Sequence, residues 1–203
     1  MKKILHIDSS AKNHDSTTRK LTEYAIKKVE ARYPNSTITY HDLTADPLAH
    51  INPTFIKAMF GGKTSNVTSN ILSMSNKLVE ELVEADIVII GAPMYNFAIP
   101  SQLKTWIDYI CRAGLTFRYT DTGPLGLLTN KNVIVAVGMG GHYSDGPMKS
   151  HDHVTPYMRQ VFNFIGIDKI TIALAEKQSL GKEVAEAEFA KAQQEIDNAV
   201  KDF

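Results

Sequence analysis

The run Ile87-Val88-Ile89-Ile90 decides the fold, because it is apolar at every position. A strand that faces water on one side alternates apolar and polar residues, whereas a strand covered on both sides reads as a nearly continuous apolar run. We therefore expect residues 87–90 to form a central strand with helices on both faces of its sheet. Pro93 and Pro100 bracket the segment that follows, so we expect a stiff loop at one end of this strand.

Four other segments have the composition of strands, and stretches with helical spacing of apolar residues separate them. The expected strands are residues 4–7, 37–41, 133–137 and 169–174. The expected helices cover about 16–33, 68–85, 101–113 with a cap at Gly114, 152–166 and 181–202. Five strands that alternate with five helices predict a doubly wound α/β fold. We expect one domain over residues 1–203, with a five-stranded parallel sheet in the order 2-1-3-4-5.

Two segments, residues 42–66 and residues 115–130, have no clear periodicity. The first contains Gly61-Gly62 and two prolines, and the second contains Gly123-Pro124. Loops of this length inside a compact domain are usually either functional or disordered. We expect both segments to be irregular excursions from the sheet.

The composition excludes several classes of protein. Lys+Arg and Asp+Glu both total 22, so no net field draws the chain to nucleic acid or to an anionic membrane. No segment reaches the roughly 20 apolar residues of a membrane span. His6 and Asp8 interrupt the short apolar run at the N-terminus, which does not read as a signal peptide, so we expect a cytoplasmic protein. The single cysteine, Cys111, is expected to be a small buried apolar residue.

Three unusual loops are expected to meet at one crevice. In a doubly wound sheet, ligands bind outside the carboxyl ends of the strands, where the strand order reverses. In the order 2-1-3-4-5 the first, third and fourth strands are neighbours. The loops that follow them are residues 9–18, 92–97 and 138–143. We therefore predict a ligand site built from these three segments.

Hydroxyl groups gather in the first loop, where Ser10 is followed by Ser16, Thr17 and Thr18 at the start of a helix. The N-terminus of a helix offers free N–H groups and a positive dipole end, so this loop can bind an anion without a lysine. Ordinary capping of the helix by Ser16 is the alternative interpretation. The chain lacks the glycine patterns of the P-loop and of the dinucleotide fingerprint.

The second loop contains Met94-Tyr95-Asn96-Phe97 between its two prolines. A stiff extended backbone beside a flat ring can offer N–H and C=O groups to ring nitrogens, and the aromatic side chains add apolar surface. The alternative is a rigid loop that packs its aromatic side chains into the core.

The third loop, Gly138-Met139-Gly140-Gly141, follows a buried strand. Glycines let the backbone approach a ligand closely, and their N–H groups can stabilise negative charge. The alternative is a simple turn. Each loop alone is ambiguous, so the prediction rests on their shared position.

These motifs, together with Phe117-Arg118-Tyr119-Thr120, resemble the FMN-dependent NADH-azoreductases, a family of flavodoxin-like NAD(P)H:quinone oxidoreductases. The resemblance covers essentially the whole chain. It implies that Ser10 and residues 16–18 bind the FMN phosphate, that residues 94–97 bind the isoalloxazine, and that residues 138–141 bind its pyrimidine end. The chain departs from the family pattern at Thr18, which often is serine, and at Gly138, which often is serine or threonine.

The resemblance also implies an activity. NADH or NADPH would reduce the bound flavin by hydride transfer, and a quinone or an aromatic azo compound would then accept the two electrons in a ping-pong cycle that protects against electrophilic quinones. No side-chain nucleophile is expected. The N–H of Asn96 would lie near flavin N5, and Phe97 and Tyr119 would wall the acceptor pocket. The family is homodimeric, which makes residues 117–128 a lid or a partner contact.

Three other interpretations have to be weighed. His151 and His153 lack a third nearby ligand, so no metal site is expected. A flavodoxin-like carrier of single electrons would tend to be shorter and strongly acidic, unlike this neutral chain. A nucleotide-binding regulatory domain without a redox role would purify without the yellow colour of a flavin.

Overall fold

The computed structural model of the protein describes residues 1–59 and 66–203. The main sheet contains β1 (Lys3–Asp8), β2 (Thr37–Asp42), β3 (Ile87–Pro93), β6 (Asn132–Gly138) and β7 (Lys169–Ala175). All of its strands are parallel and they lie in the order β2-β1-β3-β6-β7. This order is the predicted one, since β6 and β7 are the fourth and fifth strands of the sheet along the chain, and the predicted fold class is confirmed.

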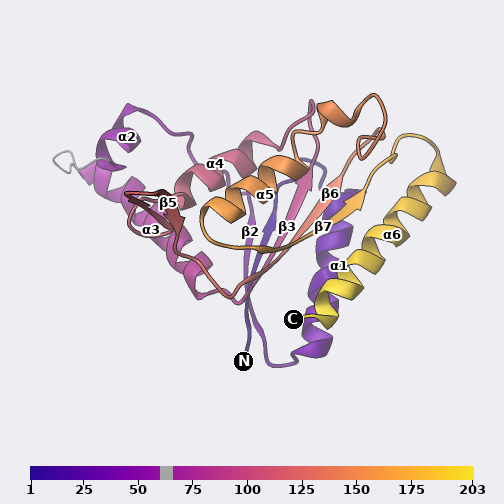
Figure 1. The fold of residues 1–203 in the computed structure, drawn as a ribbon, viewed down its shortest axis with the longest axis horizontal. Helices are drawn as coiled ribbons and strands as arrows, with labels where there is room; N and C mark the ends of the chain where they lie inside the picture. The colour runs from indigo at the N-terminus through magenta and orange to yellow at the C-terminus, as the bar shows by residue number, and fades with distance from the viewer. Residues whose placement is uncertain (60–65) are drawn as a thin grey trace.

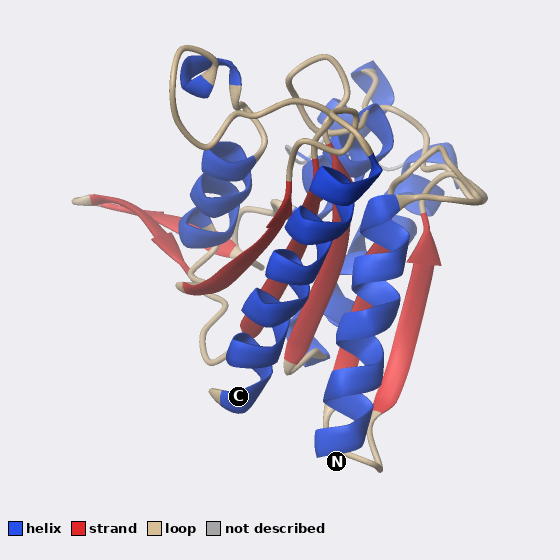
Figure 2. Ribbon diagram, turned by 90° about the vertical axis from the view of Figure 1, so that its right-hand side faces the viewer, coloured by secondary structure: helices blue, strands red, loops and turns tan. Residues whose placement is uncertain are grey.

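Helices cover both faces of this sheet, as Figures 1 and 2 show. The helices are α1 (Thr17–Arg32), α2 (Pro53–Met59), α3 (Asn66–Glu84), α4 (Ser101–Ile110), α5 (Thr155–Phe164) and α6 (Lys182–Lys201). Ile87 and Ile89 of β3 pack in one core cluster with α1 and α6, whereas Val88 and Ile90 pack in the other with α3, α4 and α5. Every residue of β3 is buried, as its unbroken apolar run predicts.

The two excursions are more regular than predicted. Residues 42–66 include the short helix α2, and residues 115–130 include an antiparallel hairpin of β4 (Phe117–Thr120) and β5 (Gly123–Gly126). The prediction that the chain simply alternates five strands with five helices is therefore wrong, because helix α2 and the hairpin are additional elements. The sequence Gly123-Pro124-Leu125-Gly126 has the composition of a turn, which hides a strand outside the main sheet. Gly61-Gly62 lies outside the described residues.

The predicted helix cap at Gly114 is also wrong. Helix α4 ends at Ile110, because the hydroxyl of Thr116 donates to the Ile110 carbonyl (2.8 Å) and accepts the N–H of Arg112 (2.9 Å). Gly114 has φ +83° and its N–H donates to the Phe117 carbonyl at 2.7 Å. Its left-handed backbone therefore serves the turn into the hairpin and not the end of the helix.

The hairpin is held against the end of α5 by a glycine contact. A Cβ on Gly126 would lie 2.1 Å from the backbone nitrogen of Gly166. We expect Gly126→Ala to lower the free energy of unfolding by about 2 kcal/mol, as overpacking typically does. Asp121→Ala, which changes an exposed side chain in the turn of the same hairpin, is the control. Equal urea midpoints for the two variants would contradict this account of the hairpin.

Candidate functional site

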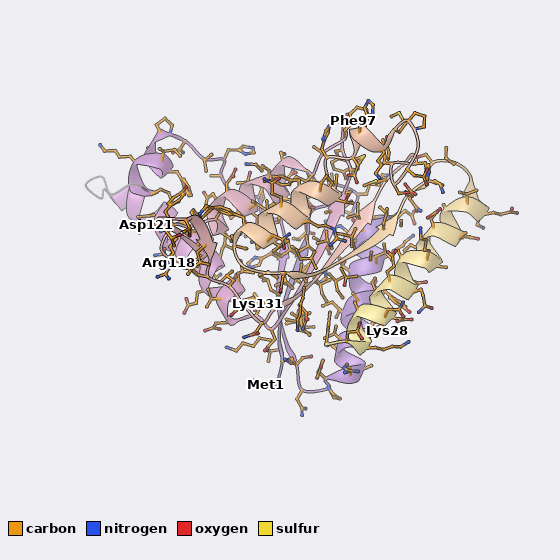
Figure 3. All side chains as sticks on the ribbon, in the orientation of Figure 1. Met1, Lys28, Phe97, Arg118, Asp121 and Lys131 are labelled. Atoms are coloured by element: carbon orange, nitrogen blue, oxygen red, sulfur yellow. The ribbon has the colours of Figure 1, made fainter. Side chains whose placement is uncertain are left out.

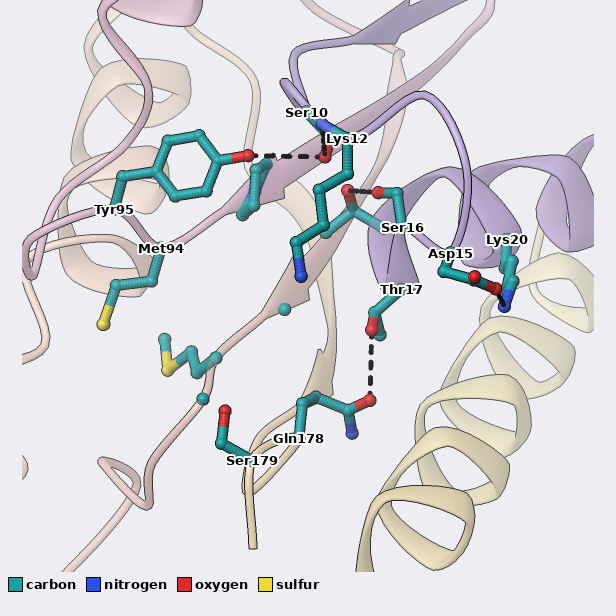
Figure 4. Close-up of a pocket in the computed structure, with 15 residues that line it drawn as sticks. Ser10, Lys12, Asp15, Ser16, Thr17, Lys20, Met94, Tyr95, Gln178 and Ser179 are labelled. Atoms are coloured by element: carbon teal, nitrogen blue, oxygen red, sulfur yellow. Dashed lines mark hydrogen bonds and ion pairs between the residues drawn. The ribbon is translucent and has the colours of Figure 1, made fainter. Parts of the chain in front are cut away.

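The three loops meet in a cleft of about 380 Å³ at the carboxyl ends of β1, β3 and β6 (Figure 4). The predicted residues that line it are Ser10, Ser16, Thr17, Thr18, Met94, Tyr95, Gly138, Met139 and Gly140. Asn96, Phe97, Gly141 and Tyr119 do not line it. The parallel topology thus brings together segments that are more than 100 residues apart in the chain, as the strand order requires.

The first loop ends at a capped helix. Ser16 is the N-cap of α1, and its Oγ accepts the N–H of Arg19 at 3.3 Å. The capping interpretation is therefore correct, yet Ser16 also lines the cleft. Among the described residues, the N–H groups of Thr17 and Thr18 have no hydrogen-bond acceptor. These donors and the hydroxyl groups beside them make this end of the cleft suitable for an anion.

The second loop makes a tight turn at its tip. Tyr95 and Ala98 exchange two main-chain hydrogen bonds of 2.9 and 3.1 Å, and between them Asn96 (φ +48°) and Phe97 (φ +72°) both adopt left-handed backbone. The N–H groups of these two residues have no acceptor within the described part of the chain. The hydroxyl of Tyr95 accepts the N–H of Ala11 at 3.0 Å, so the second loop braces the first.

The third loop is bound along its length to the segment after β7. The N–H groups of Lys177, Gln178 and Ser179 donate to the carbonyls of Gly141, Met139 and Gly140, at 2.7 to 3.0 Å. The Met139 N–H donates to Ala175 at 3.0 Å. The N–H groups of Gly140 and Gly141 have no main-chain acceptor among the described residues. Of these two residues, Gly140 lines the cleft and Gly141 does not, so the Gly140 N–H is the predicted donor that remains available there.

A buried carboxylate anchors the far end of the third loop. Glu176 is 1% exposed and accepts the N–H of Tyr143 (2.7 Å), the N–H of Ser144 (3.1 Å) and the hydroxyl of Ser144 (2.6 Å). His142 Nδ1 lies 2.8 Å from the same carboxylate. Burial would raise the pKa of Glu176, but the hydrogen bonds from Ser144, Tyr143 and His142 outweigh it and lower the pKa. Hydrogen bonds to Asp145 and then Glu176 raise the pKa of His142.

Several lining residues were not among the predicted ones. Lys12, Lys20 and Asp15 come from the first loop and helix α1, and Gln178 and Ser179 follow β7. The site was expected to need no lysine, whereas Lys12 reaches into the cleft in Figure 4. Gln178 and Ser179 could have been found, because the loop after the fifth strand opens at the same edge of the sheet. Thr17 donates to Gln178 Oε1 at 3.1 Å, which connects this loop to the first.

The two predicted walls of the acceptor pocket lie apart from each other. Phe97 is 42% exposed, and its ring contacts the rings of His151 (5.5 Å between centroids) and Tyr143 (6.3 Å). Tyr119 is 74% exposed on β4, against Phe117 of the hairpin. The structure therefore does not bring Tyr119 to the cleft of its own chain.

The described residues also bear on metal binding, membrane crossing and the state of Cys111. In residues 1–59 and 66–203, no group of three His, Cys, Asp or Glu side chains is placed to hold a metal ion. No helix in the same ranges is both long and apolar enough to cross a bilayer. Cys111 is partly buried against the core cluster, and burial raises the pKa of its thiol to about 11.

Comparison with known proteins gives a consistent result. A family model described as "Flavodoxin-like fold" matches residues 2–200. The FMN-dependent NADH:quinone oxidoreductase of Herminiimonas arsenicoxydans is 43% identical over 198 residues, which cover 97% of each chain. The chain belongs to this flavodoxin-like quinone oxidoreductase family.

Solved structures related to the family agree. An azoreductase from Bacillus anthracis str. Sterne has a TM-score of 0.92 and 27% identity, over 100% of both chains. An FMN-dependent NADH-azoreductase from Bacillus anthracis str. Ames Ancestor, in complex with FMN, has a TM-score of 0.89 and 25% identity, over 100% of this chain and 99% of that one.

Thr18 and Gly138, the two positions expected to depart from the family pattern, lie against each other. A Cβ on Gly138 would be 3.1 Å from the Thr18 methyl carbon and 3.5 Å from Thr17 Cβ. Thr18 carries a methyl group that a serine lacks, and Gly138 lacks the Cβ that a serine or threonine has. In this member of the family, the methyl group therefore occupies space that a side chain at position 138 would need.

Proposed function

We propose that this protein is an FMN-dependent oxidoreductase that passes two electrons from NADH or NADPH to quinones and aromatic azo compounds. The observation that carries the proposal is the single cleft in which a hydroxyl-rich helix N-terminus faces the Pro93–Tyr95 segment and the glycine loop. The names of the relatives support both the cofactor and the acceptors. When bound, FMN supplies the hydride-accepting chemistry, and the protein's task is to bind and orient it.

The residues present fit that cofactor. Thr17, Thr18 and Ser16 would hold the phosphate through hydroxyl groups and free N–H groups of the first helical turn, with the Lys12 ammonium adding charge. Met94 and Tyr95 would lie along the flat ring system. The N–H groups of Gly140 and Gly141 would stabilise negative charge at its pyrimidine end.

The turn at Asn96 and Phe97 would lie beside the edge of the flavin at which hydride is exchanged. The turn directly follows Tyr95, which lines the cleft, and its N–H groups have no acceptor among the described residues, so we assign the Asn96 N–H to the edge that carries N5. The Phe97 ring, backed by Tyr143 and His151, offers a flat apolar surface against which a nicotinamide or an aromatic acceptor can stack. In this cycle no side chain among the described cleft residues has to act as a nucleophile.

The test of the function uses the full chain and free FMN. The purified protein should take up FMN in a 1:1 ratio, lose its flavin absorbance rapidly on mixing with NADH alone, and regain it on addition of a quinone. Uptake of FMN without bleaching by either NADH or NADPH would indicate a one-electron carrier, and failure to take up FMN would refute the proposal.

We also propose that two copies of the chain assemble so that the hairpin of one closes the cleft of the other. Exposed apolar side chains gather on and around the hairpin, at Leu115, Tyr119, Leu125 and Leu127. Such a cluster on a monomer surface is typical of an interface. Tyr119 does not line the cleft of its own chain. In the proposed dimer, the hairpin of the other copy would place the partner's Tyr119 in the acceptor pocket.

The Tyr119→Ala variant is expected to lower kcat/KM for a quinone by about 10-fold, through loss of an aromatic contact. Its rate of flavin reduction should change less. Light scattering should give the mass of a dimer for the parent protein. A monomeric parent with full activity would contradict the proposed role of the hairpin. Arg118→Ala, on the same strand, is the control.

Lys12 is expected to add to phosphate affinity through its charge alone. Lys12→Gln should weaken FMN binding by about 3- to 10-fold at low salt, with a smaller effect at high salt because ions screen an exposed charge. Lys20→Gln is the matched control, since the Lys20 ammonium is already paired with Asp15 at 3.0 Å. Equal losses for the two variants at all salt concentrations would rule out a specific role for Lys12.

A further inference from the structure

The side chain of Arg19 binds the backbone of the first loop. It stands in the first turn of α1, and its side chain reaches back to the loop that precedes the helix. Its Nη2 donates to the Ser10 carbonyl at 2.8 Å, and its Nε donates to the Lys12 carbonyl at 3.2 Å. One guanidinium thus binds two backbone carbonyls in the first part of the segment that leaves β1.

The same guanidinium is held rigidly from the other side. Asp42, at the end of β2, accepts from Nη1 at 2.8 Å and from Nη2 at 2.9 Å. The hydroxyls of Thr44 and Tyr40 lie within 3.1 and 3.3 Å of its nitrogens. The Arg19 side chain is only 15% exposed, and a planar two-pronged contact with a carboxylate fixes its orientation as well as its position.

The charge of Arg19 is already neutralised where it lies. Besides Asp42, the buried carboxylate of Asp8 is 3.6 Å from Nη1. Asp8 is in turn held by the hydroxyls of Thr22 (2.9 Å) and Tyr40 (3.1 Å). Arg19 does not line the cleft. Its contribution there must therefore come through the shape of the loop and not through direct attraction of an anion.

We propose that Arg19 is a positioning residue for the phosphate end of the cleft. Because the carbonyl oxygens of Ser10 and Lys12 are directed at the guanidinium, they are not presented to an incoming anion, which they would repel. The loop is thereby preorganised, so binding does not have to order it. This inference rests on the proposed function, because it takes the ligand to be a flavin with a single phosphate group.

The test compares two ligands that differ only in that phosphate. Dissociation constants for FMN and for riboflavin are measured by flavin fluorescence for the parent protein, Arg19→Met and Arg19→Lys. Both variants should bind FMN roughly 10- to 100-fold more weakly, as expected when charged hydrogen bonds are lost. Riboflavin affinity should stay within about 2-fold. Lysine should not rescue, since it lacks the planar fork.

The matched control is Lys28→Met on the same helix. Lys28 also forms an ion pair, with Asp197 at 2.9 Å, but it lies at the end of the molecule away from Phe97 (Figure 3). This variant loses one positive charge and should keep both affinities. If Arg19→Met does not fold, Arg19→Gln, which keeps a hydrogen-bond donor but lacks the planar fork, should lower the FMN preference in the same direction.

The outcomes separate the two proposals. Equal weakening of FMN and riboflavin in the Arg19 variants, or an unchanged preference for FMN, would overturn the positioning role while leaving the proposed function intact. A parent protein that binds riboflavin as tightly as FMN would show that the first loop is not a phosphate site, which overturns both. A loss confined to FMN in the Arg19 variants supports the inference.

Discussion

Replacing Glu176 with alanine is expected to weaken FMN binding by about 100-fold. The change removes the acceptor of four hydrogen bonds from residues 142–144 and leaves the N–H groups of Tyr143 and Ser144 without a partner. Breaking a buried charged network of this kind typically costs about 3–5 kcal/mol, part of which the loop can recover by moving into water. The movement would take the glycine segment out of its binding position. Equilibrium titration with FMN measures the effect.

Two further variants make this prediction specific. Glu176→Gln keeps an acceptor oxygen for the loop but loses the charge opposite His142, so it should give an intermediate affinity. Asp145→Asn changes the exposed partner of the other His142 nitrogen and should have little effect. An FMN affinity in Glu176→Ala equal to that of Asp145→Asn would show that Glu176 does not anchor the site.

The same network predicts a pH dependence. The lowered pKa of Glu176 means that its stabilising contribution is present above the usual carboxyl pKa of about 4.3 and is lost as the pH falls through the lower, folded value. The raised pKa of His142 means that its contribution is complete below about pH 6.5 and is lost as the pH rises through the folded value. The stabilising contribution of this network is therefore complete between about pH 4.3 and 6.5, and the loss of unfolding free energy on the acid side should be smaller in Glu176→Gln.

Phe97→Gly is expected to keep or raise the thermal stability of the protein while lowering its activity with quinones. Phe97 has φ +72°, a left-handed conformation that costs a bulky residue about 1–2 kcal/mol and costs glycine little. The variant should therefore keep or raise its melting temperature. Loss of the ring should lower kcat/KM for a quinone by about 10- to 100-fold, because the acceptor would lose its stacking surface.

Asn96→Gly is the matched control, since Asn96 has φ +48° in the same turn and contributes no aromatic ring. It should share the gain in stability and retain most of the activity. Phe97→Tyr should retain activity as well. A Phe97→Gly variant that reduces quinones at the parent's rate would remove this residue from the acceptor pocket.

Periodicity was sufficient to predict the sheet because each of its strands has a local signal. Residues 87–90 and 133–137 are apolar throughout, and in a parallel sheet that pattern means burial on both faces. Strand order then followed from a general rule, which also located the cleft. The hairpin could not be predicted in this way, since its strands pair with each other outside the core and carry Gly123, Pro124 and exposed side chains.

The parts of the site that were missed depend on contacts distant in sequence. Glu176 lies more than 30 residues from the loop it holds, and nothing local distinguishes it from a surface glutamate. Arg19 adjoins the predicted hydroxyl cluster, but its role depends on Asp42 at the end of another strand. The family resemblance supplied Tyr119 as a site residue, but Tyr119 does not line the cleft of its own chain, so its role depends on the proposed second copy.

The protonation state of the Cys111 thiol bears on whether quinone acceptors would modify the protein. Quinones are electrophiles that add to ionised thiols, so a reactive cysteine in a quinone reductase would be alkylated during turnover. With its pKa raised to about 11 by burial, Cys111 is almost entirely in the neutral form at neutral pH. It is also the only cysteine in the chain. The protein therefore offers quinones no readily ionised thiol, and we expect it to resist alkylation by the compounds it reduces.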